Sequence, residues 1–323
     1  MNTKTLAVFV GTVSLAALPS VVTAQVAFSD DFDVNHTANW TVNTGGGTSV
    51  STANAFFDYS TVGIPSAPHS TGGTTLGMKL NANNVVASQA LGGVSVSPIG
   101  QSFTGDYQLR MDMWLNFIGP APGGGSGSTQ ITGAGIGTSG TTANYAGVAN
   151  GIWFAGTGDG NSAADYRAYT PSNPAGHTTA SPGVYAAGSQ NNSSAFYTAL
   201  FPTRTAPAAQ TTLFASQTGS ALAGSLGWAW HDIIINKTGN MVTWNIDGTL
   251  IASLDASTNG VLSGSNIMLV QSDINTTAST DANGTTLNFG LFDNLVVTVP
   301  EPATGSLFVL GASAIYLARK RRA

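Results

Sequence analysis

The sequence has 323 residues, and charged side chains make up only 8% of them. With 10 Lys and Arg against 15 Asp and Glu, it offers no basic surface to neutralise nucleic-acid phosphates, so nucleic acid is excluded as a partner. Cysteine is absent, which excludes disulfides, cysteine-ligated zinc, iron–sulfur clusters and thiol catalysis.

The middle of the chain is acidic and poor in helix-forming residues. Residues 25–299 contain five basic residues and fourteen Asp but no Glu, which gives a formal charge of −9. Thr, Ser, Asn and Gly are abundant where Glu and Lys would normally fill the exposed faces of helices. We therefore expect β-structure rather than helices.

Residues 1–24 have the pattern of a signal peptide. Lys4 precedes an apolar run from Leu6 to Leu18, and small residues at Val22-Thr23-Ala24 suit signal peptidase. We expect Sec-dependent export through the inner membrane and removal of this segment.

The body, residues 25–299, begins with short candidate strands. Residues 28–32 and 40–42 are predicted to open it, and weaker candidates lie at 56–59, 75–80 and 85–96. Residues 107–117 give a clearer signal, because apolar and polar side chains alternate there and only Trp114 breaks the alternation. This pattern predicts a half-buried strand.

Two stretches have a different composition. Residues 119–150 are rich in Gly, Ser, Thr and Ala, and residues 155–225 in Ala, Ser, Asn, Pro and Gly. We predict long loops over a sandwich, with weakly patterned strands as the alternative.

Residues 233–254 predict a three-stranded meander. Runs at 233–236, 241–246 and 250–254 are separated by Lys237-Thr238-Gly239-Asn240 and by Asp247-Gly248, and both separators are hairpin signals. Residues 287–299 alternate again and predict the closing strand.

One face of this meander is a candidate carbohydrate-binding surface. If Asn236 pairs with Met241, one face carries core residues and the other combines indoles with carboxylates and amides, as a sugar-binding surface does. The candidate residues are Trp228, Trp230, Asp232, Asn245 and Asp247. Alternatively, the two tryptophans only pack beneath a loop.

Many short strands and glycine-rich turns predict a single all-β domain, an antiparallel β-sandwich. Four motifs of the body support a closer comparison: Phe28-Ser29-Asp30-Asp31-Phe32 with Trp40, Trp230-His231-Asp232-Ile233-Ile234-Ile235, Val242-Thr243-Trp244-Asn245-Ile246-Asp247-Gly248, and Phe292-Asp293-Asn294-Leu295-Val296-Val297. With these motifs the body resembles the concanavalin A-like, or laminin G-like, jelly-roll superfamily. This superfamily includes lectins, binding modules and glucanases, so the resemblance implies a fold and not one function.

Residues 300–323 form a tripartite tail. Pro300-Glu301-Pro302 precedes an apolar stretch from Ala303 to Ala318, and the basic residues Arg319, Lys320, Arg321 and Arg322 follow. The apolar stretch predicts a transmembrane helix with its basic end in the cytoplasm. The tail resembles the PEP-CTERM sorting signal of Gram-negative bacteria that make extracellular polysaccharide. That resemblance implies an inner-membrane anchor, processing by an exosortase, and delivery to the cell surface or extracellular matrix.

Calcium is the only cofactor for which the sequence has candidates. Two loops rich in oxygen ligands could supply it, although neither has the full EF-hand pattern and such residues are also ordinary turn formers. The candidate ligands are Asp159, Asn161, Asp165, Asp281 and Asn283.

Catalytic residues are not expected. Glycoside hydrolysis usually needs a carboxylic acid and a carboxylate, and the glucanases of the resembled superfamily commonly use two Glu on one strand. The body has no Glu, and the only closely spaced aspartates are Asp30, Asp31 and Asp33. We expect a non-enzymatic surface or matrix protein of a biofilm that binds extracellular polysaccharide. The alternatives are a secreted polysaccharide-degrading enzyme with Asp-based catalysis and a purely structural matrix protein.

Overall fold

A computed structural model describes residues 24–46, 51–82, 91–118, 130–274 and 281–300. The chain divides into two units, Val26–Val299 and a second that joins Met1–Gln25 with Pro300–Ala323. Most of the second unit lies outside the described residues, including the signal-peptide segment 1–23 and the tail from Glu301 to the basic residues Arg319 to Arg322. Across the ranges given above, no helix combines the length and the apolar character that a membrane span requires.

The larger sheet of the body is antiparallel and has eight strands. Seven lie side by side, and β1 (Ala24–Asp30) pairs with β16 beside that path. The seven, in spatial order, are β14 (Thr249–Asp255), β13 (Met241–Ile246), β12 (Trp230–Thr238), β6 (Tyr107–Asn116), β16 (Phe289–Pro300), β4 (Leu76–Asn81) and β3 (Thr52–Asp58).

The second sheet has six antiparallel strands, and a short pair stands apart from both sheets. The pair consists of β10 (Arg204–Thr205) and β11 (Ser220–Ala221). The six strands, in spatial order, are β2 (Trp40–Gly45), β5 (Gly92–Pro98), β15 (Asn266–Asp273), β7 (Gln130–Thr138), β8 (Ile152–Thr157) and β9 (Tyr166–Tyr169).

Helices are short and lie in the connections. The α-helices are α1 (Ala195–Leu200), α2 (Ala208–Leu213) and α3 (Gly284–Leu287), and the 3₁₀ turns are η1 (Thr37–Asn39), η2 (Tyr59–Val62) and η3 (Thr71–Gly73).

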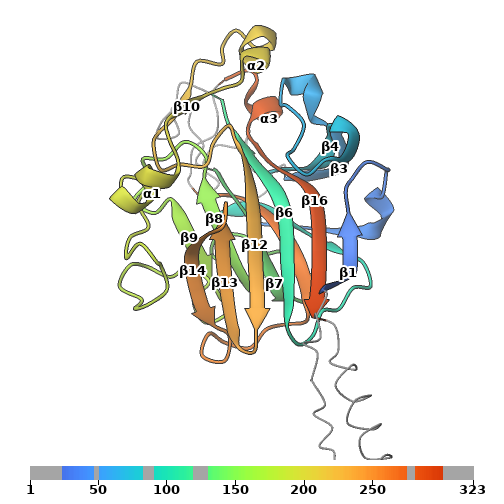
Figure 1. Ribbon diagram of the computed structural model, residues 1–323, viewed down its shortest axis with the longest axis vertical. Coiled ribbons are helices and arrows are strands. Elements are labelled where there is room, and N and C mark those ends of the chain that lie inside the picture. The colour runs from blue at the N-terminus through green and yellow to red at the C-terminus, as the bar shows by residue number, and fades with distance from the viewer. Residues whose placement is uncertain (1–23, 47–50, 83–90, 119–129, 275–280, 301–323) are drawn as a thin grey trace, which may run out of the picture. The chain divides into compact units, whose positions relative to one another are not determined.

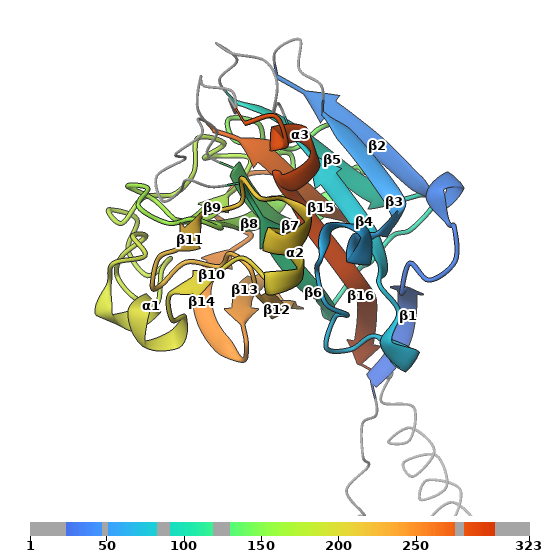
Figure 2. The ribbon, with the colours of Figure 1, turned by 90° about the horizontal axis from the view of Figure 1, so that it is seen from above.

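The two sheets form two layers of a β-sandwich (Figures 1 and 2). The main core lies between them, where Leu109 and Ile233 of the eight-stranded sheet belong to the same buried cluster as Leu269 of the six-stranded sheet. Trp244 of β13 stacks on Phe154 of β8 with the ring centroids 5.5 Å apart. The predicted antiparallel β-sandwich is therefore confirmed.

A second buried cluster lies on the outer face of the eight-stranded sheet. Tyr59, Trp114 and Phe289 are all buried there, and Trp230 packs against them. This cluster explains why Trp114 breaks the alternation of β6: its side chain faces outward but is covered by the connections that cross the sheet.

The alternating segments became strands of the eight-stranded sheet. The meander 233–254 is confirmed as β12, β13 and β14, but Met241 pairs with Thr238, and Asn236 pairs with Thr243. This register differs by two residues from the expected pairing, so each side chain keeps its predicted face.

The stretches predicted as long loops contain much of the six-stranded sheet. Residues 130–138 form β7, and the stretch 155–225 includes part of β8 and all of β9. A Cβ atom on Gly133 would collide with the carbonyl oxygen of Phe154 in the adjacent strand, so a glycine is needed there. Small residues thus mark close strand packing here rather than loop.

Candidate functional site

Three aspartates lie in a row across the eight-stranded sheet. Asp112 of β6 is directly opposite Asp293 of β16 on one side and Asp232 of β12 on the other. Side chains directly opposite in antiparallel strands have Cβ atoms about 4.5–5.5 Å apart. We call these three residues the carboxylate row.

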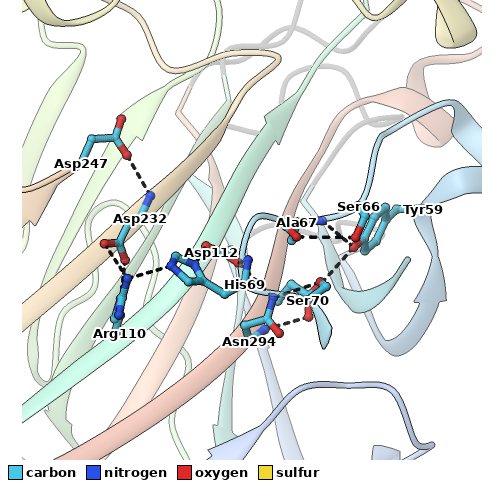
Figure 3. A network of polar contacts seen from close by, with 11 residues as sticks. Tyr59, Ser66, Ala67, His69, Ser70, Arg110, Asp112, Asp232, Asp247 and Asn294 are labelled. Carbon is cyan, nitrogen blue, oxygen red and sulfur yellow. Dashed lines mark hydrogen bonds and ion pairs between the residues drawn. The ribbon is translucent and has the colours of Figure 1, made fainter. Parts of the chain in front are cut away.

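The carboxylate row has a covered end at Asp293 and an open end at Asp232, and Figure 3 shows Asp112 and Asp232 with Arg110 beside Asp232. Asp112 and Asp293 are each only 1% exposed. The Asp232 side chain is 25% exposed, and that of Arg110 beside it is 38% exposed.

Asp112 is held by groups from two other segments. Its Oδ1 lies 2.7 Å from His69 Nδ1, and its Oδ2 accepts hydrogen bonds from the backbone N–H of His69 at 3.1 Å and from Asn294 Nδ2 at 2.9 Å. A carboxylate oxygen can only accept, so His69 Nδ1 carries the proton and Nε2 accepts from Arg110 Nη2 at 2.8 Å.

Asp293 is the group with the most unusual protonation in the row. Burial raises its pKa to about 7, and the charge of Asp112 acts in the same direction, against the lowering effect of its hydrogen bonds. Its Oδ2 lies 2.9 Å from both the Tyr59 hydroxyl and the Ser70 hydroxyl, and its Oδ1 accepts from the backbone N–H of Asn294 at 2.7 Å.

Hydrogen-bond counting supports a neutral Asp293. The Tyr59 hydroxyl has one proton but lies within hydrogen-bonding distance of two acceptors, Asp293 Oδ2 at 2.9 Å and the Thr74 carbonyl at 3.1 Å. A proton on Asp293 lets Tyr59 accept from Asp293 and donate to Thr74, so all these contacts are satisfied. The raised pKa and the hydrogen-bond pattern both favour a protonated Asp293 below about pH 7.

A β-bulge in β16 directs the side chain of Asn294, the residue after Asp293, toward Asp112. The pairing of β16 with β6 shifts between Asp293 and Val296, and Asn294 has a φ of 51°. The bulge brings the Asn294 amide to Asp112 and also to the Ser70 hydroxyl, 3.1 Å away.

The open end of the row is an ion pair. Arg110 Nε and Nη2 donate to the two carboxylate oxygens of Asp232 at 2.7 and 3.1 Å. Asp247 lies next to it and accepts from the Asp232 backbone N–H at 2.9 Å, while its other oxygen faces His231 Nδ1 at 2.7 Å. Burial acts to raise the pKa of Asp247, but the His231 contacts and the Asp232 N–H together lower it.

The predicted carbohydrate-binding residues are only partly brought together. Asp232, Asp247 and Trp230 lie at or beside the row, and Asn245 lies on β13 opposite Ile234. The Trp230 indole is half-buried, with its ring centroid 5.3 Å from that of Tyr59 and its Nε1–H donating to the Pro65 carbonyl at 2.8 Å.

Trp228 is not accessible to a ligand: it is buried in the cluster that covers the outer face of the sheet, as the alternative of tryptophans packed beneath a loop predicts. It precedes β12, has a φ of 55°, is 5% exposed, and stacks on Phe117 with the ring centroids 4.1 Å apart. The positive φ interrupts the alternation, which turns the ring into the cluster that covers the sheet.

The expectation that aspartates come close together only at residues 30–33 is also wrong. Asp30 is buried and accepts from Trp40 Nε1 at 2.9 Å, a contact between the first two strands. Asp112, Asp232 and Asp293 were missed because they are far apart in the sequence. The sequence offered one signal for them: Asp112 and Asp293 each lie in a segment with clear alternation, so each could be placed on a strand.

The calcium-ligand candidates lie in ordinary loop contacts. Asp165 accepts from Thr157 Oγ1 at 2.6 Å and from the backbone N–H of Asn192 at 2.9 Å, and burial raises its pKa. Asp281 Oδ1 accepts from the backbone N–H of Asn283 at 2.8 Å. The described ranges contain no group of three or more His, Cys, Asp or Glu that could hold a metal ion. Calcium binding by these loops stays a prediction.

Comparisons with known proteins give a similarity of fold. No protein-family model and no curated protein matches the sequence. Among solved structures, a β-glucanase from Bacillus licheniformis is 13% identical, with 85% of this chain and 98% of that chain covered and a TM-score of 0.39. An endo-1,3-β-glucanase from Streptomyces sioyaensis is 13% identical, with 90% and 100% covered and a TM-score of 0.43. The carbohydrate recognition domain of Emp47p is 9% identical, with 80% and 87% covered and a TM-score of 0.34.

The expectation of a non-enzymatic protein is contradicted by this comparison. Two of these three structures are glucanases, which are enzymes, and the third is a carbohydrate recognition domain. At these similarities the comparison removes that expectation without assigning an activity to this chain.

Proposed function

We propose that the body is a carbohydrate-active enzyme that hydrolyses a polysaccharide at the carboxylate row. The observation that supports this most strongly is the in-register alignment of Asp293, Asp112 and Asp232 on one face of the sheet. Adjacent buried carboxylates are costly to a fold, and clusters of this kind are typical of functional sites.

The two ends of the row suit the two tasks of glycoside hydrolysis. Asp293, whose pKa burial raises to about 7, is the proton donor, and Asp232, exposed and held by Arg110, is the base. They lie two strands apart, so their separation is about 9–10 Å. This is close to the upper end of the ~6.5–9.5 Å range of enzymes that invert the anomeric centre.

The proposed reaction is balanced as follows. Asp293 gives its proton to the glycosidic oxygen while the bond from that oxygen to the anomeric carbon breaks. Asp232 takes a proton from a water molecule, whose oxygen forms the new bond to the anomeric carbon. Two sugar fragments result, and the new reducing end first has the inverted configuration.

Release of reducing ends from polysaccharides tests this function. The purified full-length protein is incubated with neutral and acidic polysaccharides, with and without a calcium chelator, beside the variants Asp232→Asn and Asp293→Asn. We expect both variants to lose at least about 100-fold in rate, in keeping with the size of general acid–base effects. Asp106→Asn is the matched control, because Asp106 accepts only from the Gly239 N–H at a hairpin turn. Glycan retention without new reducing ends would overturn hydrolysis.

We also propose that the chain is exported and sorted by an exosortase, and that the body is a concanavalin A-like jelly roll. The support for sorting is the order of signal peptide, PEP motif, apolar stretch and basic end in the sequence. Cell fractionation of wild type and Glu301→Ala tests it: we expect the variant to remain in the inner membrane. Equal release of both proteins would contradict the proposal.

A further inference from the structure

The covered end of the carboxylate row is closed by a segment of the chain itself. Residues 68–75, which we call the strap, connect Ala67 to β4 and are exposed or half-buried throughout. The strap places His69 against Asp112 (Figure 3), and its Ser70 hydroxyl bonds Asp293. Its contacts therefore occupy carboxyl oxygens of Asp112 and Asp293 that a substrate would have to approach.

The strap uses the chemistry of a sugar. The Ser70 hydroxyl donates to Asp293 Oδ2 at 2.9 Å, and a hydroxyl-to-carboxyl hydrogen bond is what a glycan would offer at the same atom. His69 donates to Asp112 through its backbone N–H and its ring. Exchange of these contacts for those of a glycan would keep both carboxyl groups satisfied.

The strap is anchored at its two ends. On the N-terminal side Ile64 is 2% and Ala67 is 4% exposed, and at the C-terminal end the Thr75 hydroxyl donates to Asp58 Oδ1 at 2.9 Å. Its middle contains Gly72 and Gly73, with φ of 74° and 75° and open space around each. Exposed residues and a glycine pair between fixed ends are features of segments that open locally.

We propose that the strap is an autoinhibitory segment, a self-bound occupant of the carboxylate row that an incoming glycan must displace. The proposal deepens the proposed function, since it concerns access to the same site. It predicts a sign that a catalytic role would not give: weakening the strap increases kcat/KM.

The test compares the double variant His69→Ala, Ser70→Ala with wild type. Thr71→Ala is the matched control, because Thr71 is an exposed strap residue, whereas the strap's hydrogen bonds to Asp112 and Asp293 come from His69 and Ser70. Hydrogen exchange of the strap is measured at the His69 and Ser70 amides, which bond Asp112 Oδ2 and the Ala67 carbonyl in the closed state. Exchange of β15 in the six-stranded sheet reports whether the fold is intact.

We expect at least a tenfold loss of strap protection in the double variant, with β15 unchanged, and a several-fold fall in KM with kcat retained or raised. Adding to wild type a glycan that the protein cleaves should also lower the protection of the strap amides against hydrogen exchange. Unchanged strap protection in the double variant, a fall in kcat/KM that accompanies strap release, or increased protection when glycan binds would overturn the proposal. If the double variant loses strap protection but neither it nor wild type cleaves a glycan, the result supports opening of the strap and rejects the proposed hydrolysis.

Discussion

Each of the two sheets has a row of polar side chains, and the rows differ in charge. In the six-stranded sheet, Gln271 of β15 lies opposite Thr132 of β7, whose hydroxyl donates to Gln271 Oε1, and Gln271 Nε2 donates to Gln130 Oε1 at 2.9 Å. All three are nearly inaccessible and neutral. In the eight-stranded sheet, the row consists of Asp293, Asp112 and Asp232, and its partners include the strap and Arg110.

The difference separates a structural row from a functional one. Amide and hydroxyl groups satisfy each other between the sheets at little electrostatic cost. Facing carboxylates cannot do so, and they hold a proton or require donors from elsewhere. Neutral groups would hold the strands together at a lower electrostatic cost than carboxylates do. The charged row is therefore better explained by a chemical role than by a structural one.

The largest expected effect concerns the proton on Asp293. Its pKa is raised from 3.8 to about 7 in the folded protein, so its stabilising contribution is complete below about pH 4 and is lost as pH rises to about 7. The loss is at most about 4 kcal/mol. Urea denaturation between pH 4 and 8 should show it in wild type and not in Asp293→Asn, while Thr132→Val should shift stability by the same amount at every pH. An equal pH dependence in Asp293→Asn would contradict the assignment.

The next effect concerns strand packing in the six-stranded sheet. Gly133→Ala should cost about 3 kcal/mol, because the new Cβ meets the backbone of Phe154 in β8. Gly100→Ala is the control for a glycine in open space: Gly100 has a φ of 72° and no neighbouring atom within 4 Å, so the substitution should cost only about 1–2 kcal/mol, for the backbone conformation alone. Thermal unfolding distinguishes the two, and equal losses would refute close packing as the reason for the glycine.

Breaking each row in turn tests the comparison directly. Gln271→Ala should cost about 2–3 kcal/mol, because it leaves buried partners unsatisfied between the sheets. Asp112→Ala should lower the free energy of unfolding by about half as much as Gln271→Ala. The substitution removes the negative charge that faces Asp293, and water can reach the strap groups that lose their partner. The measurement is the free energy of unfolding in urea at pH 7. A larger loss for Asp112→Ala would mean that the charged row is mainly structural.

The smallest effect is a gain in stability at a site away from both rows. Lys79 of β4 lies 4.5 and 4.6 Å from the ring centroids of Phe57 and Phe289, and burial lowers its pKa to about 8. A lowered pKa means that the charged amine opposes folding at pH 7 and that stability rises with pH between about 8 and 10.5. Lys79→Met should therefore stabilise the protein by about 1–2 kcal/mol at pH 7, less at pH 10, with the cation–π contacts offsetting part of the gain. Destabilisation at pH 7 would show that those contacts dominate.

The sequence predicted the eight-stranded sheet far better than the six-stranded one. β6, β12 and β13 alternate because one face meets the core and the other meets water or a partial cover. In β7 and β15 every residue is buried, so no alternation is available, and β15 was not predicted at all. Small residues in β7 imitate the composition of a loop, although close packing is what requires them.

The candidate site was predicted at its open end only. Asp232 and Asp247 belong to one hairpin, so local reasoning could place them together. Asp112 and Asp293 are brought together by the pairing of β6 with β16. Nothing in the sequence of either strand indicates which strand it pairs with. The strap was invisible for the same reason, since nothing local indicates that His69 and Ser70 cross a sheet.

The bulge at Asn294 lets β16 place polar groups on one face of the sheet and still pack apolar residues against the core on the other. Phe292 and Leu295 both face the core, yet two residues stand between them where regular alternation allows one. The extra residue acts as a spacer that delivers two neighbouring polar groups to the same side and then restores the packing order for Val297. Without Asn294, Val296 would still pair with Arg110 and Leu295 would still face the core, so the strand would regain regular alternation and lose only the amide that reaches Asp112 and Ser70. The bulge therefore serves the polar centre and not the packing of the strand.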